Sequence, residues 1–235
     1  MNKKFLIIIP ARAGSKRLKD KNILDLNGKP LISWSIEAAL NLPINKDIVV
    51  SSDSDRVLNI ARQYNVKTIK RPKHLADDNS STIDVVLHTI EQFKKCYDYI
   101  VLLQPTSPLR TQQHIEEAID LLEKHQCDAV VSVCEVDHPI QWNLNVPDNL
   151  DISQESKSIL NKRSQELGKT YRLNGAIYIV RTSRVLKEKS FFLQDKISAY
   201  IMQKGCSIDI DDMFDFNLAN CIMKFNKKDN INDRK

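Results

Sequence analysis

Residues 3–22 read KKFLIIIPARAGSKRLKDKN, an apolar run that passes directly into a basic loop. The apolar part, Lys4–Pro10, has the length and composition of a buried strand. The loop carries Gly14, Ser15 and five cations, which are Arg12, Lys16, Arg17, Lys19 and Lys21. Ligands of open α/β sheets bind at the carboxyl ends of strands, and cations beside a glycine suit a phosphate. The segment therefore predicts a phosphate site after the first strand of an α/β sheet.

The loop differs from two common phosphate-binding motifs. The dinucleotide-binding fingerprint needs three spaced glycines, and this loop has only Gly14. The Walker motif needs Gly-Lys-Ser or Gly-Lys-Thr, whereas the order here is Gly14-Ser15-Lys16. The sequence therefore gives poor support to a hydride-transferring NAD enzyme and to a P-loop NTPase.

Strand-like and helix-like segments alternate along the rest of the chain. Further strands are expected at Asp47–Ser52, Lys67–Ile69, Tyr99–Gln104, Ala129–Glu135, Gly175–Val180 and Ser198–Met202. Helices are expected at Leu31–Leu40, Asp55–Tyr64, Ser81–Phe93, Thr111–His125 and Asp212–Met223. Apolar strands separated by helices indicate an α/β fold with a mainly parallel sheet that helices cover on both faces.

The length of 235 residues suits one large domain with an insertion. The alternation stops after Glu135, and residues 138–171 are polar, with two prolines and little periodicity. We expect residues 1–224 to form the domain and residues 138–171 to be a lid, a specificity loop or a subunit contact within it. We expect the charged residues 225–235 to be a frayed tail.

Composition excludes several classes of protein. The formal net charge is only +5, and no basic tract is interleaved with aromatic residues, so nucleic-acid binding has little support. No apolar run approaches the ~18–20 residues of a membrane span. The five cysteines are odd in number and lack CxxC spacing, which indicates reduced thiols in a cytoplasmic protein. Small anionic substrates fit this composition better.

A second group of functional residues lies in SIDIDD, residues 207–212. Alternation in an extended segment turns Asp209 and Asp211 to one side and Ile208 and Ile210 to the other. Two carboxylates at a strand end suit Mg²⁺, which binds one or two carboxylates together with substrate phosphates. The alternative is a solvated acidic turn before a helix, where Asp212 would be favourable in any case.

Other polar residues also stand at predicted strand ends. Gln104 closes the strand Tyr99–Gln104 in LLQPTSPLR, and Arg71 heads the loop after Lys67–Ile69. Asn174 and Gly175 lie just before the predicted strand in NGAIYI, where a tight turn or a close approach to a ligand is expected.

Taken together, these motifs resemble the acylneuraminate cytidylyltransferase family, which comprises CMP-sialic acid synthetases and their CMP-legionaminic acid relatives. The matching segments are IPARAGSKRLKDKN, NGKPLISWSIEAAL, LADDNSSTID, LLQPTSPLR, NGAIYI and SIDIDD. The resemblance implies a Rossmann-like nucleotidyltransferase domain with a small dimerisation insertion. It also implies a magnesium-dependent homodimer in which CTP and a nine-carbon 2-keto sugar acid give a CMP-sugar and pyrophosphate.

The resemblance implies roles for individual residues. It assigns nucleotide binding to Ala11, Arg12, Ala13, Gly14, Ser15, Lys16, Lys21, Asn22, Arg71, Ser80, Ser81 and Thr82. It assigns the metal to Asp209 and Asp211, and catalysis to Arg12, Lys21 and Asp211. It assigns the sugar to Gln104, Arg163, Asn174, Tyr178, Phe191 and Phe192, with Arg163 reaching across a dimer interface.

The segment HPIQW departs from the family pattern. Sialic-acid enzymes tend to have a lysine where this chain has Gln141, and Trp142 follows. A lost cation and a larger apolar surface favour a less hydroxylated sugar, which is legionaminic acid in preference to N-acetylneuraminate. Two alternatives remain: a cytidylyltransferase for pseudaminic acid or 3-deoxy-octulosonate, and a non-catalytic nucleotide-binding regulator.

Overall fold

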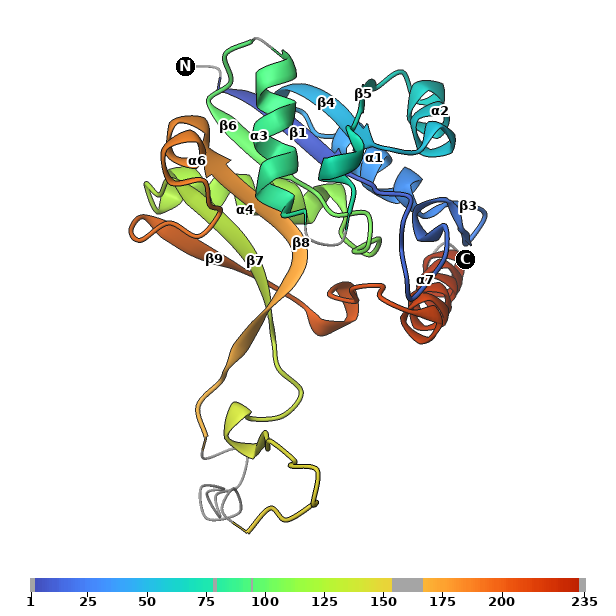
Figure 1. Ribbon diagram of the computed structural model, residues 1–235, viewed down its shortest axis with the longest axis vertical. Helices are drawn as coiled ribbons and strands as arrows, with labels where there is room; N and C mark the ends of the chain where they lie inside the picture. The colour runs from blue at the N-terminus through green and yellow to red at the C-terminus, as the bar shows by residue number, and fades with distance from the viewer. Residues whose placement is uncertain (1–2, 78–79, 94, 154–166, 233–235) are drawn as a thin grey trace.

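A seven-stranded sheet forms the centre of the computed structural model, which describes residues 3–77, 80–93, 95–153 and 167–232 (Figure 1). Its strands stand in the order β5-β4-β1-β6-β8-β7-β9. Their bounds are β1 Lys4–Pro10, β4 Asn45–Ser52, β5 Lys67–Lys70, β6 Tyr99–Leu102, β7 Ala129–Glu135, β8 Tyr171–Arg181 and β9 Ile197–Met202. Only β8 runs antiparallel to its neighbours within this sheet, so the predicted mainly parallel sheet is confirmed.

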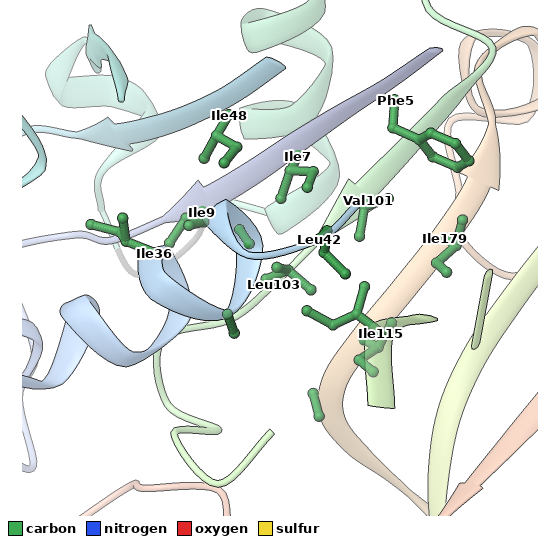
Figure 2. Close-up of a cluster of buried hydrophobic side chains, with 14 of the residues drawn as sticks. Phe5, Ile7, Ile9, Ile36, Leu42, Ile48, Val101, Leu103, Ile115 and Ile179 are labelled. Carbon is green, nitrogen blue, oxygen red and sulfur yellow. The ribbon is translucent and has the colours of Figure 1, made fainter. Parts of the chain in front are cut away.

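The helices cover both faces of the sheet because successive side chains of β1 point in opposite directions. Ile7 and Ile9 pack with α1, α2 and α4, as Figure 2 shows for Ile36 and Ile115. Leu6 and Ile8 pack on the other face with α3 and α6. The helix bounds are α1 Leu31–Leu40, α2 Asp55–Gln63, α3 Thr82–Phe93, α4 Gln112–Lys124, α6 Thr182–Glu188 and α7 Met213–Asn232. Short 3-10 turns lie at η1 Lys21–Ile23, η2 Lys73–Leu75, η3 Ile140–Trp142 and η5 Lys204–Cys206.

A small hairpin lies outside the sheet and was not predicted. Its strands are β2 Asp25–Leu26 and β3 Lys29–Pro30. The turn between them is Asn27-Gly28, and both residues have positive φ, at 57° and 94°. Asn-Gly is a strong hairpin signal, but the strands that it joins are too short to have a readable alternation.

Strands β7 and β8 extend beyond the sheet as a long twisted arm (Figure 1). Strand β8 begins at Tyr171, four residues before the predicted Gly175, because its pairing with β7 continues along the arm. The described part of the segment expected as an insertion lies at the far end of this arm, away from the sheet (Figure 1). Its role in dimerisation stays a prediction.

The helix predicted to end at Met223 continues to Asn232, so the charged residues from Lys224 to Asn232 are helical. No glycine or proline stands between Met213 and Asn232 to stop the helix, and fraying of the tail stays a prediction. Within the described residues, no helix combines the length and the apolar character that crossing a membrane requires.

Candidate active site

A cleft of about 280 Å³ opens at the carboxyl ends of β1 and β6. It brings together eight residues that the sequence predicted, from segments far apart in the chain. They are Arg12, Ser15, Lys21, Asn22, Arg71, Ser80, Thr82 and Gln104. Parallel strands end at the same edge of the sheet, which is why loops that follow different strands meet there.

The basic loop after β1 is shaped by contacts with the fold. The Asn22 amide donates to the Arg12 carbonyl oxygen at 2.9 Å, and the Arg12 guanidinium donates to the Asp77 carbonyl oxygen at 3.1 Å. The Asp53 carboxylate accepts from the Ala13 N–H at 2.9 Å. These bonds hold Arg12 at the mouth of the cleft.

Several loop residues predicted to bind nucleotide through their backbone are occupied within the fold. The N–H groups of Ala11, Ala13 and Ser15 bond to Ser51, Asp53 and Ala13 respectively. These N–H groups have partners within the fold, and the role of the three residues in binding nucleotide stays a prediction. Gly14 and Lys16 lie outside the residues that line the cleft, so cationic side chains rather than a cage of amides face the ligand space.

Arg71 is a buried cation at the base of the cleft. Its guanidinium donates to the Ser51 carbonyl oxygen at 2.8 Å and to the Leu75 carbonyl oxygen at 3.4 Å. Burial lowers the pKa of Arg71 to about 10, an effect that the nearby Asp53 charge opposes. Carbonyl groups are neutral, so they do not cancel the positive charge of the guanidinium, which can still attract an anionic ligand.

The three hydroxyl residues before α3 have different surroundings. Ser80 and Thr82 line the cleft, and the Ser80 hydroxyl lies 2.8 Å from the His74 carbonyl oxygen. The Ser81 hydroxyl accepts from the Asp84 N–H at 3.2 Å and so caps α3. Ser81 is therefore a capping residue, and its contact with nucleotide stays a prediction.

The two predicted metal carboxylates lie next to the phosphate loop. Lys21 Nζ is 3.6 Å from one oxygen of Asp211 and donates to the Ile210 carbonyl oxygen at 2.5 Å. Arg17 Nη2 is 2.9 Å from the other oxygen of Asp211. Burial lowers the pKa of Lys21, and the charges of Asp211 and Asp209 oppose this shift. The sequence placed Arg17 in the loop but did not predict its contact with Asp211.

Asp209 is the more buried of the two carboxylates. Burial raises the pKa of Asp209, and the charge of Asp211 adds to the shift. One of its oxygens, Oδ1, is buried and has no hydrogen-bond partner among the described residues. A buried carboxylate oxygen without a donor is suited to a cation.

Gly175 lies beside both Gln104 and Asp209, in a backbone conformation that favours glycine. Its φ is +73°, and a Cβ atom built on it would lie 3.5 Å from both Asp209 Oδ2 and Gln104 Oε1. Glycine adopts this positive φ without steric cost, whereas any residue with a side chain would be strained there. The predicted turn at this residue is an irregularity within β8, and it joins the carboxylate edge to the cleft.

Arg110 supports this edge from within the fold and was missed by sequence reasoning. Its guanidinium donates to the carbonyl oxygens of Gln104 at 3.1 Å and Ala176 at 3.0 Å, and to the Ser35 hydroxyl at 2.5 Å. Burial lowers the pKa of Arg110 to about 9. The available signal was its place at the end of LLQPTSPLR, which does not by itself indicate burial.

The predicted aromatic wall is a real cluster. The ring of Tyr178 lies 5.4 Å from that of Phe191 and 6.2 Å from that of Phe192. Burial raises the pKa of Tyr178, and the Asp209 charge contributes, which puts this wall beside the carboxylates. Phe191 also belongs to the core, whereas Phe192 is exposed.

Asn174 is buried and its amide serves the fold. It donates to the Ser207 hydroxyl at 3.0 Å and accepts from the Ser132 hydroxyl at 2.6 Å and the Ala176 N–H at 3.2 Å. The contact of Asn174 with substrate stays a prediction. The sequence alone does not distinguish a polar residue at a strand end that binds substrate from one that forms hydrogen bonds within the fold.

Gln141 and Trp142, which were also predicted to contact the sugar, are remote from the cleft of their own chain. Gln141 and Trp142 form part of η3, at the end of the arm (Figure 1). The ring of Trp142 stacks on that of His138, with the centroids 6.3 Å apart. Arg163 lies outside the described residues.

The chain matches a sequence-family model described as cytidylyltransferase over residues 6–221. It is 38% identical over 98% of its length to an N-acylneuraminate cytidylyltransferase of Escherichia coli, of which it covers 55%. It is 35% identical to a pseudaminic acid cytidylyltransferase of Campylobacter jejuni, over 95% of this chain and 97% of the relative. It is 34% identical to a CMP-N,N'-diacetyllegionaminic acid synthase of Legionella pneumophila, over 96% and 98%.

The chain thus spans about half the length of the N-acylneuraminate relatives that it matches. Among solved structures it is similar to CMP:2-keto-3-deoxy-manno-octonic acid synthetase complexed with CTP, with a TM-score of 0.71. The two share 20% identity, and the match covers 95% of this chain and 100% of the other. This likeness confirms the Rossmann-like fold.

Proposed function

The chain belongs to the cytidylyltransferase family, and on that premise we propose that it transfers CMP from CTP to a nine-carbon 2-keto sugar acid. The observation that carries the proposal is the cleft at the carboxyl edge of the sheet. There the cations Arg12, Lys21 and Arg71 converge beside the carboxylates Asp209 and Asp211. This pairing of cations with acids suits a nucleoside triphosphate and a metal together.

The reaction needs positioning and neutralisation of charge more than covalent help from the protein. The anomeric hydroxyl oxygen of the sugar attacks the α-phosphorus of CTP, and the bond to the β-phosphate oxygen breaks. Arg12 and Lys21 bind the triphosphate and stabilise the negative charge that develops on the leaving pyrophosphate. Arg71, Ser80 and Thr82 bind the cytosine and the ribose at the base of the cleft.

Asp209 and Asp211 are the residues that would hold Mg²⁺. The unpartnered buried oxygen of Asp209 fits a cation, and two carboxylates leave coordination positions for phosphate oxygens and water. When bound, the metal supplies further neutralisation of the phosphate charges. Lys21 and Arg17, which pair with Asp211 here, lie close enough in the chain's phosphate loop to turn toward the triphosphate.

The sugar binds between Gln104 and the aromatic wall of Tyr178, Phe191 and Phe192. The choice between sugars rests on residues of this chain, since relatives of 34–38% identity are named for three different acids. The lost cation at Gln141 and the apolar surface of Trp142 favour a legionaminic-type sugar over N-acetylneuraminate. Pseudaminic acid and 3-deoxy-octulosonate remain the alternative substrates.

The protein acts as a homodimer joined through the arm. Six large apolar residues of the arm and its end are exposed in the single chain, namely Ile140, Trp142, Val146, Leu150, Tyr171 and Leu173. Such a concentration of exposed apolar surface supports a subunit contact. A partner's arm is also the means by which Gln141, Trp142 and Arg163 would reach a cleft.

A cytoplasmic location is supported by the cysteines. All five are unpaired, as expected in a reducing compartment.

The function is tested by pyrophosphate release from CTP and Mg²⁺ with N-acetylneuraminate or di-N-acetyl-legionaminate as acceptor. Turnover of the legionaminate at least tenfold faster, about 1.4 kcal/mol in transition-state binding, supports both the reaction and the sugar. A preference for N-acetylneuraminate keeps the reaction and contradicts the sugar. If neither acceptor is turned over, pseudaminic acid and 3-deoxy-octulosonate are tested next, and retained CTP binding without turnover of any of these four contradicts the reaction and supports a non-catalytic regulator.

A further inference from the structure

Helix α7 has one apolar face that packs against the domain. Phe216, Ala219 and Met223 are buried in a core cluster with Leu31 and Ile210. This face accounts for the attachment of the helix to the fold.

A second apolar face of α7 has no cover within the described residues. It carries Phe214, Leu218, Cys221 and Phe225, all of them exposed, and we call these four residues the α7 stripe. Phe214 is 74% and Phe225 is 66% exposed. Two almost fully exposed aromatic side chains on one helix face are unusual unless the face meets a partner.

The stripe has the spacing of a coiled-coil seam. Its members are separated by four, three and four residues, which is the d-a-d-a order of a heptad repeat. The side chains therefore form a narrow row along the helix, suited to packing against a second helix rather than against a sheet.

The stripe is also symmetric about its centre. Phenylalanine stands at both ends, and Leu218 and Cys221 lie equally far from the midpoint between Ala219 and Asn220. A two-fold axis at that midpoint sets Phe214 opposite the Phe225 of a second copy, and Leu218 opposite its Cys221. Pairing of a with d is the pattern of antiparallel helices, and self-complementary patches make two-fold dimers. We propose that the α7 stripe binds the α7 stripe of a second copy in antiparallel orientation.

The distribution of charged residues along α7 supports antiparallel pairing, and it supports a second copy of the chain as the partner in preference to a membrane. The first turn of α7 and its approach are acidic, with Asp212 and Asp215, and Lys224 lies toward the other end. Antiparallel pairing brings the acidic end of one helix to the level of the other's Lys224, whereas parallel pairing would join the two acidic ends. From Met213 to Asn232 the sequence has three lysines, Lys224, Lys227 and Lys228, against Asp215 and Asp229, so α7 has an excess of only one cation, whereas a membrane-surface helix is typically rich in them.

The size of the stripe sets the strength of the contact. Two aromatic residues, a leucine and a cysteine bury on the order of 400 Å² per copy. A standard interface buries about 800 Å² per partner, so we expect association only at micromolar or higher concentrations. This contact is separate from the proposed arm dimer, and it would double the mass of whatever species the arm forms.

Sedimentation velocity over a wide range of concentration tests the contact. The unaltered chain should double in mass as concentration rises, and the variant Phe214→Ser/Phe225→Ser should lose that step. Leu186→Ser is the control, because it removes an exposed leucine from a different helix, α6, and should keep the step. A step that persists in the double variant, or that is absent from the unaltered chain at the highest concentration, overturns the proposal.

Disulfide cross-linking tests the orientation independently of affinity. The background is Cys96→Ser, since Cys96 is exposed elsewhere in the chain. In that background Leu218→Cys places a thiol opposite the second copy's Cys221, and a covalent dimer should form at least tenfold faster than with Cys221 alone. Parallel helices would instead bring the two Cys221 thiols together. Cross-linking as fast with Cys221 alone, or no gain from Leu218→Cys, overturns the antiparallel pairing.

Discussion

Asp209 is a carboxylate whose burial opposes its ionisation, and its raised pKa makes a prediction about stability. The folded chain binds this proton more tightly than the unfolded chain. Ionising Asp209 therefore costs stability as the pH rises past the unfolded pKa, and the cost is complete above the folded pKa. The same charge is the one that a metal requires, so stability and catalysis make opposite demands on this residue.

We predict that Asp209→Asn makes the chain more stable at pH 7, by on the order of 1 kcal/mol, because asparagine keeps the shape without the buried charge. The gain should shrink in acid, where Asp209 is protonated. Pyrophosphate release should fall by about two orders of magnitude. Denaturant unfolding at neutral and acidic pH measures the first effect, and a less stable variant at pH 7 would contradict it.

The buried side chain of Arg110 links the segment just after β6 to β8 through hydrogen bonds. It bonds the carbonyl groups of Gln104 and Ala176, and Gly175, next to Ala176, lies beside the side chains of Gln104 and Asp209. Arg110 Nη1 serves both carbonyl groups while Nη2 serves the Ser35 hydroxyl, and a lysine has only one terminal nitrogen, so it cannot reach all three acceptors.

Arg110→Lys is accordingly expected to lower the free energy of unfolding by about 3 kcal/mol, since buried carbonyl groups and a buried charge lose their partners. Arg56→Lys is the matched control, because Arg56 forms an exposed ion pair with Asp20 at 2.8 Å. The control should change stability by less than about 0.5 kcal/mol. Equal effects in the two variants would refute the role given to Arg110.

At the scale of the element, the start of α7 fixes the metal carboxylates. The Asp215 carboxylate accepts from the N–H groups of Asp211 at 2.9 Å and Asp212 at 3.2 Å. The helix terminus and the candidate metal site therefore share their hydrogen bonds. An ordinary cap in the same chain is Ser54, whose hydroxyl accepts from the Val57 N–H at 3.4 Å at the start of α2.

Alanine variants of Asp215 and Ser54 can be compared directly, because the loss of either cap should destabilise the fold by the same amount. Asp215→Ala and Ser54→Ala should each lower the free energy of unfolding by about 1 kcal/mol. Only Asp215→Ala should also weaken Mn²⁺ binding and pyrophosphate release, and Asp215→Asn should restore part of both because its amide oxygen still accepts. If both alanine variants kept full metal affinity, the link between the α7 terminus and the site would be refuted.

At the scale of the whole molecule, the arm separates two groups of predicted substrate residues. The cleft lies at the sheet, and the segment with Gln141 and Trp142 lies at the end of the arm (Figure 1). Both groups can act on one sugar only if a second copy brings its arm to the cleft. The site is then complete only in the dimer.

Mixing two inactive variants tests this arrangement. Lys21→Ala removes a cleft cation, and Arg163→Ala removes the arginine expected from the partner. A mixed dimer has one site with both residues intact, so co-expression should recover about a quarter of the parent activity, given random pairing. Activity no greater than the sum of the separate variants would show that each chain completes its own site.

The sequence predicted the fold well because the signals are local. Buried strands such as Lys4–Pro10 are continuous apolar runs, and helices such as α1 carry apolar residues at helical spacing, so both are readable without knowing their neighbours. The hairpin β2–β3 was missed because its two-residue strands are too short to show an alternation. The length of β8 was missed because pairing with β7, which is distant in the sequence, decides it.

The sequence by itself also determined which chemical groups this protein has available: a basic loop at a strand end and two carboxylates on one side of an extended segment. Only the tertiary structure decided which groups face the cleft. In the folded chain, hydrogen bonds within the protein occupy the N–H groups of Ala13 and Ser15, the hydroxyl of Ser81 and the amide of Asn174. Arg110 is buried and bonds to the carbonyl oxygen of Gln104. The physical reason is that a polar group bonds to whichever partner folding brings within about 3 Å, and for Ala13, Asn174 and Arg110 that partner lies far away in the sequence.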